Sequence, residues 1–352
     1  MATIKEIAKL AGVSIGTVSN VLNELPSVRE PARQRVLAVI DSLGYQPSLL
    51  GRALRKDKTN IIVMIVPDIT NPFFPGVVRG AEDVAFQNGY RLVLCNSDND
   101  YAKESAYMRE LRTYRPSGLI IVPSDLTKGQ ELAREYMNEG AAVVYMDRIP
   151  PRWRGDAVTS AHEMGAYEAT RHLISLGHKR IATITGPLQG TSAVERLAGF
   201  QRAMKEAGLP VPREYVQESE FNLAGGRDKA ASLLNLRTRP TAIFAANDLI
   251  AIGAIKATRE AGLSCPDDIS IFGFDNLEMD GETVPPLSTV DQFISELGVR
   301  AAQIVISRLA GERSAAIRVC IPTSLRVRES TGPVRSRSGK PKPGRSGSRK
   351  RG

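Results

Sequence analysis

The sequence predicts two kinds of domain, a small all-α unit at the N-terminus and a larger α/β unit built on parallel sheets. Three observations predict this fold class. Residues 1–60 carry helix signals only. From residue 61, apolar runs of strand length alternate with amphipathic stretches of helix length, which is typical of a parallel sheet with helices on both faces. The alternation breaks near residue 160, so two sheets fit better than one.

The N-terminal unit is predicted to contain three short helices. Thr3 and Glu6 form a capping-box pair at the start of the first helix, and Gly12 ends it. Ser14 can cap the second helix, and the third is expected to begin near Pro31. Two short helices joined by a tight glycine-containing turn, with a third helix as support, form the helix-turn-helix pattern. The third helix is expected to bury Val36, Val39, Ile40 and Leu43.

The α/β unit contains eight predicted strands, with a helix-length segment between most of them. The predicted strands are 61–66, 91–95, 118–122, 142–146, 157–159, 181–185, 241–245 and 269–274. The clearest predicted helices are 74–89, 161–176, 194–207 and 249–261.

Basic residues are concentrated at the two ends of the chain. The net charge is +9, residues 1–60 hold nine basic and five acidic residues, and eight basic residues without an acidic one follow Glu329. A polyanionic partner would therefore meet the ends and not the mildly acidic middle. Residues 331–352 are expected to be a disordered basic tail, either a phosphate-binding tail or a plain solvated terminus. Aromatic residues make up only 5%, which disfavours an RNA-binding platform of stacked rings.

Several other classes of site lack support. No CxxC occurs, and Cys95 and Cys320 are expected to be small buried hydrophobes. The G-x-S-x-G match at 12–16 follows a helix instead of a strand, which excludes a nucleophile elbow. No Walker A or G-x-G-x-x-G sequence occurs, so we expect neither a cofactor nor an enzyme. The three histidines are not spaced along the sequence as metal ligands usually are; they are His162, His172 and His178. The start MATIKEIAKL is not a secretory signal, and we expect a soluble cytoplasmic protein.

A family resemblance rests on motifs spread over about residues 2–330. Residues 2–23, ATIKEIAKLAGVSIGTVSNVLN, resemble the DNA-binding head of the lactose-repressor/galactose-repressor (LacI/GalR) family. The match continues through LGYQP at 43–47 and VPDITNPFF at 66–74, and resumes at 177–181, 196–200, 246–248, 273–275 and 322–325. The resemblance implies an all-α helix-turn-helix headpiece and an α/β periplasmic-binding-protein-like core of two parallel-sheet subdomains. It also implies a dimeric regulator, a repressor in our interpretation, that binds operator double-stranded DNA under control of a small effector.

The resemblance divides the chain into four parts. They are a helix-turn-helix domain at 1–47, a hinge helix or linker at 48–60, a ligand-binding and dimerisation core at 61–330, and the tail at 331–352. The first core subdomain is expected at about 61–160 plus 291–320, and the second at about 161–290 plus 321–330.

The second helix is the predicted DNA-recognition helix. The side chains near the start of this helix do not lie on its apolar face. The N-terminal end of a recognition helix can enter the major groove of DNA. These residues are Ile15, Gly16, Thr17, Ser19 and Asn20. Asn20 suits adenine, whereas Ile15 can contact a thymine methyl group or belong to the core. The other DNA-contact candidates are Thr3, Arg29, Arg33 and Tyr45, the last three at phosphates; a solvated arginine is the alternative for Arg29.

Residues 48–58, SLLGRALRKDK, resemble the hinge helix of the family. By resemblance, Leu54 of each subunit wedges into the minor groove, and Arg55 adds positive charge beside it. Gly51 weakens an isolated helix by roughly 0.5–1 kcal/mol, so we expect the segment to fold only on DNA. A plain charged linker is the alternative.

The predicted effector site lies beyond the carboxyl ends of the strands, where parallel α/β sheets bind ligands. By resemblance, Asp147, Asn247, Asp275 and Arg196 match ligand-contacting positions, and such a set can hold adjacent sugar hydroxyls. Further candidates are Phe73, Phe74, Phe221 and Thr191. We therefore expect a sugar or sugar derivative. The purine-binding member of the family has a second arginine in the loop that begins at Gly190 here. The glycine therefore disfavours a purine-like corepressor without excluding it. The alternative function is that of a ligand-binding or transport receptor that does not bind DNA.

Overall fold

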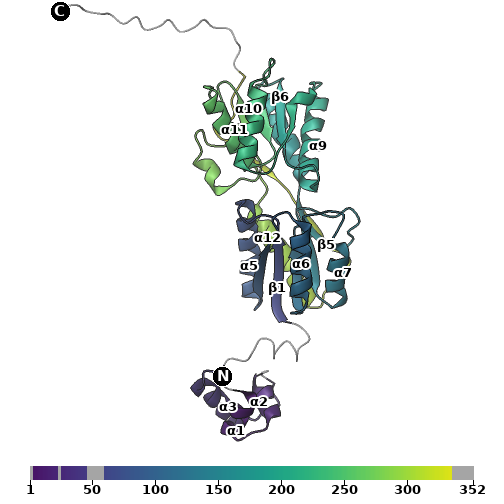
Figure 1. Ribbon diagram of the computed structural model, residues 1–352, viewed down its shortest axis with the longest axis vertical. Coiled ribbons are helices and arrows are strands. Elements are labelled where there is room, and N and C mark those ends of the chain that lie inside the picture. The colour runs from purple at the N-terminus through teal and green to yellow at the C-terminus, as the bar shows by residue number, and fades with distance from the viewer. Residues whose placement is uncertain (1–2, 23–24, 46–58, 335–352) are drawn as a thin grey trace, which may run out of the picture.

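The computed structural model describes residues 3–22, 25–45 and 59–334 (Figure 1). Its N-terminal part contains α1 (Ile4–Ala11), α2 (Ile15–Leu22) and α3 (Glu30–Ser42). These helices enclose a small core made of Ile7, Ala8, Ala11, Val18, Val21 and Val36. The predicted helix-turn-helix headpiece is confirmed in type and order.

Local signals in the headpiece act as predicted. Thr3 Oγ1 accepts from the Glu6 backbone N–H (3.3 Å) while the Glu6 carboxylate accepts from the Thr3 N–H (2.8 Å), which completes the capping box. Gly12 ends α1 in the left-handed region at φ +63°, and Ser14 Oγ accepts from the Thr17 N–H at 3.0 Å. One prediction was wrong: Leu43 is 40% exposed, because α3 ends at Ser42 and the chain turns before Leu43 can face the core.

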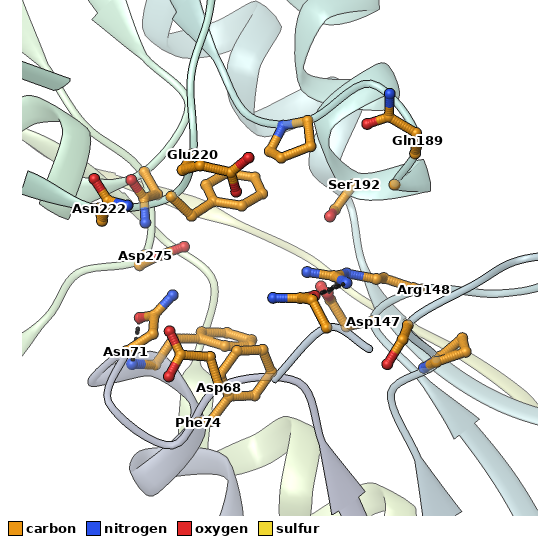
Figure 2. A pocket seen from close by; sticks show the side chains of 18 of the residues that line it. Asp68, Asn71, Phe74, Asp147, Arg148, Gln189, Ser192, Glu220, Asn222 and Asp275 are labelled. Carbon is orange, nitrogen blue, oxygen red and sulfur yellow. Dashed lines mark hydrogen bonds and ion pairs between the residues drawn. The ribbon is translucent and has the colours of Figure 1, made fainter. Parts of the chain in front are cut away.

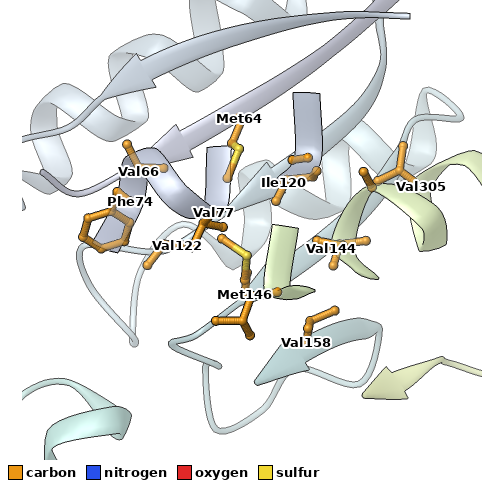
Figure 3. Packing of buried hydrophobic residues seen from close by; sticks show 14 of the residues in the cluster. Met64, Val66, Phe74, Val77, Ile120, Val122, Val144, Met146, Val158 and Val305 are labelled. Carbon is orange, nitrogen blue, oxygen red and sulfur yellow. The ribbon is translucent and has the colours of Figure 1, made fainter. Parts of the chain in front are cut away.

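The first sheet has six parallel strands in the order β11-β5-β4-β3-β1-β2. Their bounds are β1 (Thr59–Val66), β2 (Arg91–Asn96), β3 (Pro116–Ile121), β4 (Ala142–Met146), β5 (Asp156–Ser160) and β11 (Arg318–Ile321). One face packs against α5 (Phe73–Gln87) and α12 (Ile294–Leu309), where alternate residues such as Met64, Ile120 and Val144 form the core of Figure 3. The other face packs against α6 (Tyr101–Arg112) and α7 (Gln130–Asn138). Burial on both faces explains the continuous apolar runs in the sequence.

The second sheet has four parallel strands in the order β7-β6-β8-β9. Their bounds are β6 (Ile181–Thr185), β7 (Val216–Glu218), β8 (Ala242–Ala245) and β9 (Ser270–Phe272). Helices α8 (His162–Ser175) and α9 (Thr191–Glu206) cover one face, and α10 (Leu223–Leu234) and α11 (Asp248–Glu260) cover the other. Two short 3₁₀ helices lie at Arg213–Tyr215 and Glu278–Gly281. The predicted pair of parallel sheets is confirmed, and Figure 1 shows the two subdomains end to end.

The chain passes between the subdomains three times. It leaves the first sheet after β5, returns to it after β10 (Thr289–Asp291) to form α12 and β11, and leaves again towards β12 (Ser324–Arg326). Strands β10 and β12 pair antiparallel beside this crossing. The first sheet is therefore completed by residues far along the chain.

Four strands were not predicted, namely β7, β10, β11 and β12. Each is short and includes a charged residue, unlike the equally short β8 and β9, so none forms a continuous apolar run. Strand β11 also exposes alternate residues, so Cys320 is exposed and its expected burial was wrong, whereas Cys95 is buried. Among the described residues, no helix is long and apolar enough to cross a membrane.

Candidate functional site

A cavity of about 290 Å³ lies between the two subdomains (Figure 2). Its walls are the segments that follow the carboxyl ends of β1, β2, β3 and β4 in the first sheet and of β6, β7, β8 and β9 in the second. The lining residues are Asp68, Asn71, Phe73, Phe74, Asn99, Pro123, Ser124, Leu126, Asp147, Arg148, Pro187, Gln189, Gly190, Ser192, Arg196, Glu220, Phe221, Asn222, Asn247, Asp275 and Gln292. This is the location that ligand binding to parallel sheets predicts.

Arg196 and Asp275 form one buried side of the cavity. The Arg196 guanidinium is 4% exposed, donates from Nη1 to the Ala246 carbonyl oxygen (2.6 Å), and lies 3.5 Å from Asp275 Oδ1. It also stacks 3.8 Å from the centre of the Phe274 ring. Burial raises the pKa of the Asp275 carboxyl well above its usual value, although the charge of Arg196 opposes the shift. Asp275 Oδ1 accepts from Gln292 Nε2 as well as facing Arg196.

The pKa of Asp147 is shifted in the opposite direction to that of Asp275. Burial alone would raise the pKa of Asp147, but the contact with His162 and the charges of Arg148 and Arg196 outweigh burial and lower it. Asp147 Oδ1 lies 3.3 Å from His162 Nε2. The cavity thus contains one carboxyl group whose pKa is lowered and one whose pKa is raised.

His162 positions Arg196, a role that its sequence spacing did not reveal. Burial and then the charge of Arg196 lower the pKa of His162, so the ring is neutral. Its Nδ1 lies 3.4 Å from Arg196 Nε and 3.3 Å from Nη2, both of which can only donate. The remaining ring proton is then on Nε2, facing Asp147.

Two buried amides offer unsatisfied groups to the cavity. Asn247 Oδ1 caps α11 by accepting from the Ile250 N–H (2.9 Å), but its Nδ2 has no partner among the described residues. Gln292 Nε2 donates to Asp275, whereas its Oε1 likewise has none. Buried polar groups are normally paired, so these two atoms are available to a bound molecule.

Aromatic rings lie on both sides of the cavity. Phe73 and Phe74 pack edge to face, with ring centroids 5.0 Å apart, on the side of the first subdomain. Phe221 lines the cavity from the second subdomain. Figure 2 shows Phe74 and Glu220, which precedes Phe221 in the chain, on different sides of the cavity. The Phe221 ring fits only because residue 186 is glycine: a Cβ there would be 2.0 Å from the ring.

The structure brings seven of the eight predicted effector residues to one cavity: Phe73, Phe74, Asp147, Arg196, Phe221, Asn247 and Asp275. Thr191 does not line it, because the first turn of α9 directs Ser192 there instead. Asn96, at the end of β2, does not line the cavity, and its Oδ1 accepts from the Ile69 N–H at 2.7 Å. Sequence reasoning did not single out Asn99, Ser124, Arg148, Gln189, Glu220, Asn222 or Gln292 as site residues. Of these residues, Arg148 could have been found from the sequence, because it directly follows the predicted site residue Asp147.

The headpiece exposes the start of α2. Ile15 is 48% exposed, so its alternative placement in the core was wrong, and Gly16 is exposed beside it. Thr17, Ser19 and Asn20 are half-buried. The buried side of the helix is formed by Val18 and Val21.

The candidate phosphate contacts differ in availability. Arg29 is exposed at the start of α3, where its side chain makes no capping bond. Arg33 Nη2 donates to the Leu25 carbonyl oxygen (2.7 Å), so part of this guanidinium is used within the headpiece. Tyr45 packs against the headpiece core, and Thr3 is occupied by the capping box. Leu54 and Arg55 lie outside the described residues.

A helix-turn-helix unit joined to a two-subdomain core with a cavity between the sheets defines a DNA-binding regulator of the ligand-binding type. Comparison with known proteins agrees. Residues 3–48 match the family model "Bacterial regulatory proteins, lacI family", and residues 170–331 match "Periplasmic binding protein-like domain".

Two relatives illustrate the similarity. The regulator DegA of Bacillus subtilis (strain 168) is 36% identical over 333 residues, which is 94% of this chain and 98% of DegA. The repressor PurR of Aliivibrio salmonicida (strain LFI1238) is 38% identical over 309 residues, 88% of this chain and 92% of PurR. The chain therefore belongs to the LacI family and is a DNA-binding transcriptional regulator.

Solved structures show the same fold. The lac repressor dimer bound to operator and the anti-inducer ONPF has a TM-score of 0.83 at 26% identity, covering 94% of this chain and 99% of that one. The regulator CelR in complex with cellobiose has a TM-score of 0.72 at 28% identity, covering 94% and 100%. A LacI-family regulator from Enterococcus faecium with bound ribose has a TM-score of 0.69 at 31% identity, covering 78% and 100%.

Proposed function

We propose that this regulator is a dimeric repressor whose affinity for operator DNA is controlled by a sugar or sugar derivative bound between the subdomains. The observation that carries this proposal is the convergence of Arg196, Asp275, Asn247 and Asp147 on one cavity of about 290 Å³. Charged and amide groups fix adjacent hydroxyls by paired hydrogen bonds, while phenylalanine rings cover the apolar faces of a sugar ring. The cellobiose and ribose complexes of similar proteins support a sugar in this core.

Control of DNA binding follows from linkage. A ligand that contacts both subdomains favours their closed arrangement, and it changes DNA affinity by the amount of that preference. Coupling of about 1–3 kcal/mol, or about 5–150-fold in affinity, is typical. An inducer lowers the affinity for operator DNA and a corepressor raises it, and both would act through the same cavity and subdomain movement.

The second candidate effector is a purine-like corepressor. The identity of 38% to a repressor named PurR favours it. The glycine at position 190, where the purine-binding pattern has an arginine, opposes it. The neutral pairing groups Asn247 and Gln292 are compatible with either ligand.

The DNA-reading surface in this proposal is the start of α2. Ile15, Thr17 and Asn20 would contact base edges, and Arg29 would contact a phosphate. By the family resemblance, Leu54 and Arg55 would act in the minor groove as part of a hinge helix. Arg33 contributes less in this view, because it already binds the Leu25 carbonyl oxygen.

A gel-shift titration tests the proposal. The full chain is mixed with DNA from beside its own gene and with random duplex at several salt concentrations, with and without sugars and nucleobases. We expect preference for one palindromic site, change of that affinity by one ligand class, and retention of both after removal of residues 331–352. Equal affinity for random duplex would show phosphate contacts alone and would contradict the proposal.

A further inference from the structure

One corner of the cavity is positively polarised by the start of α9. This helix has 16 residues, and its N-cap, Gly190, provides no side-chain hydrogen bond. No acidic residue occupies its first turn. An uncapped helix start presents free N–H groups and roughly half a positive charge, which favours an anion.

Ser192 adds a side-chain group to this corner. It lies in the first turn of α9 and is only 3% exposed, yet no hydrogen-bond partner for its hydroxyl is found among the described residues. Figure 2 shows its oxygen directed into the cavity. A buried hydroxyl without a partner, aimed at a cavity, indicates a missing ligand atom.

Arg148 reaches the same corner from the first subdomain. It follows β4, its side chain is 14% exposed, and its Nε lies 3.8 Å from the place that a Cβ of residue 190 would take. Its Nη1 donates to Asn99 Oδ1 (2.8 Å), but its Nε has no hydrogen-bond partner among the described residues. The Arg148 side chain thus lies in van der Waals range of the start of α9.

The charge of Arg148 is only partly neutralised. Asp147 Oδ2 lies 3.9 Å from Arg148 Nε, but the same carboxylate also faces His162 at 3.3 Å. Glu104 and Glu220 also act on the charge of Arg148, whereas Asp68 lies beside Phe74 in Figure 2. Arg148 and Arg196 are the two basic residues that line the cavity, so an anionic ligand would have to compete with these carboxylates for Arg148.

We propose that the effector is an anionic polyhydroxy compound whose carboxylate or phosphate group binds between Arg148, Ser192 and the first turn of α9. Its hydroxyl groups would then reach Arg196 and Asp275. A guanidinium and helix N–H groups recognise either anion, so the shared chemistry is the negative charge. Because Arg148 belongs to one subdomain and α9 to the other, the anion would join the two. This inference rests on the proposed function of the cavity as the effector site.

Matched pairs of ligands test the inference on the full chain by isothermal titration calorimetry. The pairs are gluconate with glucitol, glucose 6-phosphate with glucose, and ribose 5-phosphate with ribose, and hypoxanthine is added as a neutral base. We expect at least one anionic member to bind tenfold or more tightly than its neutral partner. The first pair reports a carboxylate, and the other two report a phosphate.

Substitutions then assign the anion to its site. Arg148→Met should weaken the anionic ligand at least tenfold and its neutral partner less than threefold, and Ser192→Ala should show a smaller loss of the same kind. The control Arg152→Ala removes the same charge from an exposed position and should change neither affinity.

Three results would overturn the inference: no anionic probe binds, neutral partners bind equally well, or Arg148→Met weakens both members of a pair equally. Its failure is distinguishable from failure of the proposed function. If glucose or hypoxanthine binds and Asp275→Asn abolishes that binding, the cavity remains the effector site and only the anionic class is wrong. If Asp275→Asn leaves every measured affinity unchanged, both proposals fail.

Discussion

Two aspartates at the cavity adopt backbone conformations that side chains rarely allow. Asp147 has φ +60° directly after β4, and Asp275 has φ +131° three residues after the end of β9. Such conformations cost about 1–3 kcal/mol each and persist only where surrounding contacts hold them. Here those contacts include Arg196, Gln292 and His162. The observed strain at both residues therefore supports a binding role for this edge of the two sheets.

Asp275→Asn should abolish or strongly reduce the response of operator binding to effector. The amide keeps the size of the side chain but removes its titratable proton and one acceptor facing Arg196. Gel shifts with and without effector measure the response, and Asp228→Asn, at an exposed ion pair, is the matched control. An unchanged response in Asp275→Asn would place the effector elsewhere.

Gly186→Ala should weaken effector binding at least tenfold with little loss of stability. The new Cβ would lie 2.0 Å from the Phe221 ring, which is half-buried and must move out of the cavity. Calorimetry with an effector measures the affinity. Gly281→Ala, where nothing lies within 4 Å of the new Cβ, is the control. Normal affinity in the Gly186 variant would show that Phe221 does not contact the ligand.

At the scale of single elements, the headpiece depends on its helix caps. Helices α1 and α2 have eight residues each, too few to be stable alone in water. Six buried residues, with seven partly buried ones packed against them, hold these helices together with α3 in the described part of the headpiece. Capping bonds at Thr3 and Ser14 therefore supply a large share of the stability of the surface that reads DNA.

Ser14→Ala should destabilise α2 by about 1 kcal/mol, because the Thr17 N–H loses its acceptor. Hydrogen exchange of the α2 amides in the full chain should accelerate about fivefold, and operator affinity should fall. Gln34→Ala, on the exposed side of α3, serves as the control. Unchanged exchange in Ser14→Ala would mean that the turn alone fixes the start of this helix.

At the scale of the whole molecule, three buried carboxyl groups meet near the crossing between subdomains. Asp248 accepts from the Thr289 hydroxyl (2.6 Å) and the Leu277 N–H (3.1 Å). Neither carboxyl oxygen of Asp280 has a hydrogen-bond partner among the described residues. Burial and the charge of Asp248 raise the pKa of Asp280 to about 10, and burial also raises the pKa values of Asp248 and Asp275. The native state therefore retains protons that the unfolded chain releases.

These groups should make stability fall as pH rises. The folded pKa of Asp280 exceeds its ordinary value of 3.8, so its contribution is complete below about pH 4 and is lost progressively up to about pH 10. Asp280→Asn should therefore be more stable than the parent chain by an amount that grows from pH 5 to pH 9 in urea unfolding. Glu282→Gln, on the exposed side, should track the parent. A constant difference across pH would contradict the raised pKa.

Features that depend on residues close together in the chain were predictable from the sequence. The capping box at Thr3 and Glu6 and the turn at Gly12 were predictable because each depends on residues within one helical turn. The long strands were predictable because burial on both faces requires a continuous apolar run, as in β1 and β4. Short strands such as β7 carry too few residues for such a pattern.

The sequence by itself determined the all-α headpiece, the two parallel sheets and seven of the residues that line the cavity. Only the tertiary structure decided that His162 positions Arg196, and that Arg148 and Ser192 meet at one corner from different subdomains. The physical reason is that caps and hydrophobic periodicity are local, whereas a binding site depends on contacts between residues far apart in the chain. Those contacts exist only once both sheets are packed and the chain has crossed between them.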